Sequence, residues 1–199
     1  MALIANELPE NVWQKIQINA GVLCKSFDTK TWTVKQADIL GATSGGLNFT
    51  DTPEYSDFGE DIDNCPKNTY QLKRFSSREV KVSGTYVALG KDTLKNTIGG
   101  ADITETSKGS GQVAFSTIKP RDELKEADFQ DLWIVGDYGD SGNGIAVHLM
   151  KTLSTGGLNW QTTDKEKGQF SFEYSAHYSL TDYHTVPYEV CIKDVAASE

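Results

Sequence analysis

The carboxylates that could bind a metal ion gather in one segment, which runs from Asp57 to Asn64. Carboxylate oxygens are the ligands that Ca²⁺ prefers, and an EF-hand loop spaces them at alternate positions, with a glycine sixth and a glutamate twelfth. Here Cys65 and Pro66 stand where the third ligand and the glycine belong. A solvated loop or a loop at an interface is therefore the favoured interpretation, and no metal site is predicted.

A candidate nucleophile lies in residues 139–142, Gly-Asp-Ser-Gly, which match the nucleophile loop of trypsin-like serine proteases. In those enzymes the general-base histidine precedes the serine, whereas His148, His177 and His184 all follow it here. A turn between strands explains this segment better. The chain also has no glycine-rich loop followed by Lys-Ser or Lys-Thr, and no two acids in an apolar setting. We predict that the protein is not an enzyme and needs no cofactor, with a glycoside hydrolase as a remaining alternative.

A short phrase occurs twice, because residues 44–49, Ser-Gly-Gly-Leu-Asn-Phe, recur at 155–160 as Thr-Gly-Gly-Leu-Asn-Trp. Glycine adopts positive φ without steric cost, so each Gly-Gly pair predicts the end of a strand, and the triplet after it predicts the start of the next. The turn glycines are Gly45, Gly46, Gly156 and Gly157. Two such turns suggest two related halves, and repeated hairpins with few candidate catalytic residues indicate assembly rather than catalysis.

Length and charge limit the remaining possibilities. With 199 residues the chain has the size of one domain, which we place at residues 1–199. The net charge of −9 opposes tight binding to nucleic acid, because DNA-binding proteins neutralise phosphates with Lys and Arg. No apolar run approaches the roughly 18 residues of a membrane span. Cys24, Cys65 and Cys191 form no Cys-x-x-Cys pair, so neither a zinc site nor a disulfide framework is expected.

Alternation of apolar and polar residues predicts a chain made mostly of β-strands. Residues 79–89 and 169–180 alternate over their whole length, which is typical of strands buried on one face. Further strands are predicted at 132–138, 145–153 and 188–193, and short helices at 92–98 and 120–130.

The expected fold is all-β with one or two short helices, arranged as an antiparallel β-sandwich or half-barrel. Within the single domain we distinguish an N-terminal arm at 1–14, an acidic loop or hairpin at 51–68, and a C-terminal strand and tail at 181–199.

Four segments, in this order and spacing, resemble the tail tube (major tail) proteins of long-tailed bacteriophages. They are residues 40–49, 53–63, 78–85 and 153–178. The resemblance implies hexameric rings that stack into a hollow tube, to which each subunit adds strands of a continuous inner β-barrel. It also implies a structural virion protein, part of the virion tail and made in the cytoplasm of the host bacterium.

The resemblance also implies the partners of the tube. It surrounds a tape-measure protein during assembly and meets tail-tip and tail-terminator proteins at its ends. DNA passes through the lumen during genome delivery without specific binding, and the monomer does not insert into a membrane.

These expectations give two sets of candidate residues. Polar residues of the predicted strands would line the lumen, namely Glu79, Lys81, Glu173 and His177. Residues of the acidic loop would contact a neighbouring subunit or ring, namely Tyr55, Phe58, Glu60, Asp61 and Asp63. For Tyr55 and Phe58 the alternative is a place in the core of their own subunit. For the whole chain the alternative is a carbohydrate-binding β-sandwich of a receptor-binding or cell-wall protein.

Overall fold

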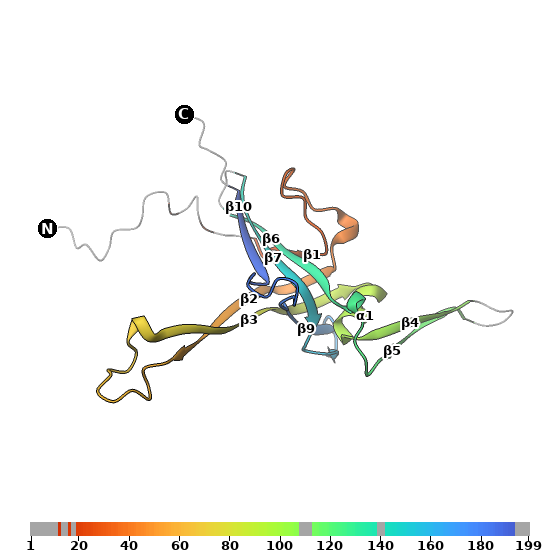
Figure 1. Ribbon diagram of the computed structural model, residues 1–199. Coiled ribbons are helices and arrows are strands. Elements are labelled where there is room, and N and C mark those ends of the chain that lie inside the picture. Colours follow the sequence, from red (N-terminus) through yellow and green to blue (C-terminus); the bar gives the residue numbers. More distant parts are fainter. Residues whose placement is uncertain (1–11, 13–15, 17–18, 108–112, 139–141, 194–199) are drawn as a thin grey trace.

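The computed structural model describes residues 12, 16, 19–107, 113–138 and 142–193 (Figure 1). All but one residue of the predicted N-terminal arm lie outside this range, as do the tail after residue 193 and residues 139–141 of the candidate nucleophile loop. The fold is mostly β with one short α-helix, so the all-β prediction is confirmed at this level.

The strands form a large antiparallel sheet and a small sheet of two strands, and the large sheet is not closed on itself. Its order is β1-β6-β7-β9-β3-β2, with β10 beside β7 and β8 beside β9. These strands are β1 (Val22–Cys24), β2 (Gly41–Asp57), β3 (Lys73–Leu89), β6 (Gln130–Tyr138), β7 (Asn143–Ser154), β8 (Asn159–Gln161), β9 (Gln169–Ser175) and β10 (Tyr188–Lys193). The small sheet pairs β4 (Ala101–Thr106) with β5 (Phe115–Pro120).

The helix α1 (Lys91–Ile98) matches the prediction for residues 92–98 and ends at Gly99, whose φ of 96° favours glycine. The helix predicted at 120–130 is wrong, because only a 3-10 turn, η5 (Glu126–Asp128), forms there. The carboxylate of Asp128 accepts hydrogen bonds from the Lys125 N–H and from Arg121, which holds the preceding residues in an open loop. Two more 3-10 turns are η3 (Gln36–Asp38) and η4 (Tyr70–Leu72).

The apolar core lies against one face of β3 and β9. Val80, Val82 and Tyr86 of β3 are buried there, as the alternation predicts. Phe172 of β9 stacks on Tyr86 with ring centroids 4.2 Å apart. Leu149 of β7 belongs to the same cluster, so both parts of the large sheet share one core.

The strand predicted at 169–180 is too long, because β9 ends at Ser175. The next N–H groups bond to two different strands: Ala176 donates to Val80 O, and His177 donates to Met150 O. The chain therefore leaves the sheet although its alternation continues, and Leu180 is 97% exposed.

The two copies of the repeated phrase have different structures. Gly156 and Gly157 form the predicted turn between β7 and β8. Gly45 and Gly46 do not end a strand: they form a bulge inside β2, between the pairs Ser44–Thr85 and Leu47–Gly84. Both have positive φ, 81° and 84°, which explains why glycine occupies these positions. The positive φ belongs to a bulge within the strand and not to a turn that ends it. The repeat therefore does not mark two equivalent halves.

Two hairpins extend beyond the body to opposite sides (Figure 1). One is formed by β2 and β3, which are 17 residues each and pair along their length. β9 pairs with β3 only between Lys81 and Tyr86, so the outer part of this hairpin, residues 53–78, has no neighbouring strand among the described residues. We call this part the arm. The other hairpin is β4–β5.

Candidate functional site

Three of the four predicted lumen residues lie together on one face of β3 and β9. Lys81 Nζ is 2.7 Å from Glu79 Oε1 and 3.6 Å from Glu173 Oε1, so one ammonium bridges two carboxylates. The hydrogen bond to Glu79, and then the charge of Glu173, raise the pKa of Lys81. Lys81 therefore stays charged at neutral pH.

This cluster belongs to a wider surface, because residues at alternate positions of a strand share a face and antiparallel partners lie side by side. We call this surface the polar face; it consists of Asn48, Thr50, Thr52, Glu79, Lys81, Ser83, Thr85, Ser171, Glu173 and Ser175. All of them except Ser175 are exposed or half-buried. The opposite face of the same strands is the apolar core. The three strands thus form a wall with a polar face that is accessible to solvent and an apolar face that is buried in the core.

The fourth candidate, His177, is not on this face, because β9 ends before it. Its Nδ1 lies 3.1 Å from Lys151 O, and its ring packs edge-on against Phe129 with centroids 5.4 Å apart. His177 and Glu79 nevertheless line one open depression at the end of the polar face, together with Thr155 and Ser175. The sequence missed Thr155, whose hydroxyl bonds to Glu173 Oε1 at 3.1 Å.

The predicted contact residues lie at the end of the arm. Tyr55 and Phe58 are 53% and 65% exposed, so their alternative placement in the core is wrong. Glu60, Asp61 and Asp63 are exposed in the loop that follows β2. The acidic loop or hairpin predicted at 51–68 is the outer half of β2 with this loop.

Asp57, the first carboxylate of the acidic segment considered above for metal binding, organises the loop at the end of the arm. Asp57 Oδ1 accepts the Gly59 N–H at 2.9 Å, and its Oδ2 accepts the Asn68 N–H at 2.8 Å. These two backbone hydrogen bonds, in this order, lower the pKa of Asp57. Asp57 therefore closes the loop through two backbone hydrogen bonds.

A polar network sits where the arm joins the body. Arg78 Nη1 lies 2.9 Å from Asp51 Oδ2, and the Tyr188 hydroxyl donates to the same oxygen at 2.7 Å. Both side chains of the ion pair are largely buried, 23% and 20% exposed. The network thus links the arm to the C-terminal strand β10.

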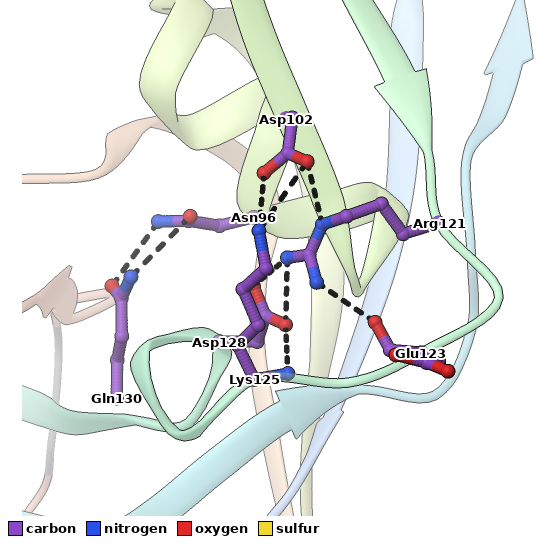
Figure 2. A network of polar contacts seen from close by, with 7 residues as sticks. All are labelled: Asn96, Asp102, Arg121, Glu123, Lys125, Asp128 and Gln130. Atoms are coloured by element: carbon purple, nitrogen blue, oxygen red, sulfur yellow. Dashed lines mark hydrogen bonds and ion pairs between the residues drawn. The ribbon is translucent and has the colours of Figure 1, made fainter.

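A second network fixes the base of the β4–β5 hairpin (Figure 2). Arg121 Nη2 contacts both carboxylate oxygens of Asp128, at 2.7 and 2.8 Å, while its Nε lies 3.1 Å from Asp102. Lys125 Nζ is 3.2 Å from Asp102 on the other side. The side chain of Asp128 is only 4% exposed, so this is a buried carboxylate with its partners in place.

Within the described residues no group of three His, Cys, Asp or Glu side chains could hold a metal ion. No helix in the described part of the chain is long and apolar enough to cross a membrane. No protein-family model matches this chain, and a search of curated proteins gives no match either.

Proposed function

We propose that this protein is a structural virion protein that forms the tail tube of a long-tailed bacteriophage. Its copies would form hexameric rings, and stacked rings would make the conduit for genome delivery into the host. In this proposal the sheets of neighbouring subunits join into one large β-barrel.

The observation that carries the proposal is the long free edge of β2. This strand is 17 residues long and lies at the end of the large sheet, where β3 is its only strand partner among the described residues. The backbone N–H and C=O groups along its other side need partners, and soluble proteins rarely leave so long an edge open. Pairing with a strand of the next subunit satisfies these groups, and a closed ring leaves no edge.

The polar face supports its assignment to the lumen. A barrel wall needs a dry side that packs against the body of the subunit and a wet side that faces the channel. Glu79, Lys81 and Glu173 lie on the wet side, and His177 lines the depression at its end. The cluster holds two carboxylates and one ammonium, and the chain carries a net charge of −9, so the wall repels phosphate and lets DNA slide.

The remaining partners in the proposal come from the resemblance to tail tube proteins. The lumen would hold a tape-measure protein during assembly, and the end rings would meet tail-tip and tail-terminator proteins. The protein would act in the virion tail after synthesis in the bacterial cytoplasm.

Sedimentation velocity and negative-stain microscopy of the purified full chain test this function. We expect a concentration-dependent shift to large species, seen as rings or tubes with a central pore. A chain that stays monomeric at every concentration would refute the proposal. If such a monomer also bound a glycan array, the carbohydrate-binding alternative would be supported instead.

A further inference from the structure

The arm carries an aromatic surface that nothing in its own chain covers. Tyr55 of β2 and Phe75 of β3 are register partners, 53% and 50% exposed, and their rings meet edge-on with centroids 6.2 Å apart. A register shift between Glu54 and Tyr55 turns Phe75 to the same sheet face as Tyr55. This face continues the one that holds Val80 and Val82 in the core. The sheet face that is buried in the core therefore continues along the arm, where it is exposed to solvent.

Cations surround this aromatic pair. Lys73 Nζ lies 5.7 Å from the ring centre of Tyr55, and the Arg78 guanidinium lies 5.7 Å from that of Phe75. Arg74 is adjacent and bonds only to the backbone carbonyls of Gln71 and Lys73. Neither Lys73 nor Arg74 forms an ion pair with a described residue. A surface that covers this pair should therefore be apolar at its centre and acidic around it.

The chain itself presents such a surface on the other side of the body. In the loop of residues 122–126, which follows β5, Leu124 is 53% exposed. Asp122, Glu123 and Glu126 flank it, and all three are exposed without an ion pair to a described residue. We call this loop the Leu124 loop. It is tied to the start of the β4–β5 hairpin by the Arg121 N–H, which donates to Gly100 O at 2.8 Å, and that hairpin projects away from the arm (Figure 1).

The Leu124 loop is held in one shape before any partner arrives. Arg121 Nη1 donates to Glu123 O at 2.8 Å, while Nη2 of the same guanidinium donates to the Asp128 carboxylate. The Lys125 N–H donates to Asp128 Oδ2 at 2.8 Å, which closes the loop from its other end (Figure 2). A preformed loop loses little conformational entropy on binding, which favours it as a docking element.

From this complementarity we propose that the aromatic pair of the arm docks onto the Leu124 loop of a second copy of this chain. The two surfaces differ and lie on opposite sides of the subunit, so the contact is head-to-tail and repeats from copy to copy. Tyr55 and Phe75 bury Leu124, while Lys73 and Arg74 face its carboxylates. The inference rests on the proposed self-assembly and adds to it the surface that receives the arm.

A charge exchange tests the contact in the full-length protein. The arm variant is Lys73→Glu with Arg74→Glu, the loop variant is Glu123→Lys with Glu126→Lys, and a third protein carries all four changes. Each single-side variant should raise the protein concentration needed for assembly by about tenfold or more, because like charges then face each other. The combined variant should return it toward the wild-type value. Matched controls change the same charges at exposed positions elsewhere, Lys30→Glu with Lys35→Glu and Asp164→Lys with Glu166→Lys, and should assemble like the wild type.

A second measurement does not depend on altered charges. With a photo-crosslinking amino acid at position 75, mass spectrometry of mixed isotope-labelled copies should find cross-links between that position and residues 121–128 of another copy. If the wild type assembles but the single-side variants assemble equally well, or the cross-links map elsewhere, this docking contact is wrong while the proposed function stands. If the wild type never assembles, the proposed function fails and the contact fails with it.

Discussion

The hydroxyl of Tyr188 donates a hydrogen bond to Asp51 Oδ2 across 2.7 Å and so fastens the C-terminal strand β10 to the base of the arm. Arg78 holds the same oxygen, at 2.9 Å. The hydrogen bond to Asp51, helped by burial and by the Asp51 charge, raises the pKa of Tyr188. The stabilisation is therefore fully present below about pH 10, the pKa of an unfolded tyrosine, and is lost as the pH rises through the raised pKa.

Replacing Tyr188 by phenylalanine should lower the free energy of unfolding by about 1 kcal/mol at pH 7, because Asp51 loses one donor. It should also remove part of the loss of stability above about pH 10. Urea denaturation at several pH values measures both effects. Tyr183→Phe is the control, since Tyr183 is 64% exposed, and equal stability of the two variants would contradict this role.

Because of the buried carboxylate of Asp128, the free energy of unfolding should depend on pH in the acidic range. Burial opposes its ionisation, but the hydrogen bonds from the Lys125 N–H and from Arg121 outweigh burial and hold the pKa of Asp128 below its ordinary value. The network therefore stabilises the fold above about pH 4, and this stabilisation is lost as the pH falls through the depressed pKa.

Asp128→Asn should cost about 2 kcal/mol of stability at pH 7, because the largely buried Arg121 guanidinium loses a charged partner. The variant should also show a flatter loss of stability below about pH 4 than the wild type. Chemical denaturation at pH 7 and in acid gives both values, with the exposed Asp164→Asn as a reference. A variant as stable as that reference would show that the network does not hold the Leu124 loop.

The bulge in β2 should depend on its glycines through the backbone alone. A Cβ at position 45 would meet nothing within 4 Å, but the φ of 81° strains any other residue. Gly45→Ala should therefore cost about 1 kcal/mol in thermal or urea unfolding. Gly168→Ala, where φ is ordinary and a Cβ makes normal contacts, should be nearly neutral. Equal effects would mean that the positive φ at position 45 is not maintained.

Labelling of a cysteine on the polar face can show whether this face lines a channel. In a background without Cys65 and Cys191, Lys81→Cys in assembled tubes should react with a small maleimide but not with one attached to a particle wider than the pore. Lys30→Cys, at an exposed turn, should react with both. Reaction of position 81 with the large reagent in intact tubes would place this face outside.

The local alternation of apolar and polar residues predicted several strands and the face that a strand buries. The buried face of β3 with Val80 and Val82 follows from alternation, and β10 occupies the predicted residues 188–193. The polar positions of the predicted strands also placed Glu79, Lys81 and Glu173 in one set, and these three side chains lie together. Three of the residues that define the polar face could therefore be chosen from the sequence, whereas His177 lies outside it.

Several of the errors involve partners far along the chain. β9 ends at Ser175 because the next two N–H groups donate to different strands, Ala176 to Val80 O and His177 to Met150 O. The alternation of apolar and polar residues nevertheless continues to residue 180. Asp51 and Tyr188 are 137 residues apart, and no spacing rule joins them. Gly45 resembles Gly156 in sequence, but pairing with β3 makes the first a bulge residue. Such contacts follow from the fold and not from the neighbouring residues.

Cryo-electron microscopy of the concentrated, full-length protein would locate the β2 edge and the polar face of the assembled protein in one map. We expect stacked hexameric rings in which β2 pairs with a strand of the adjacent subunit while Glu79, Lys81 and Glu173 face an open pore. A self-contained monomer, or an oligomer with β2 unpaired and the polar face outside, would contradict it.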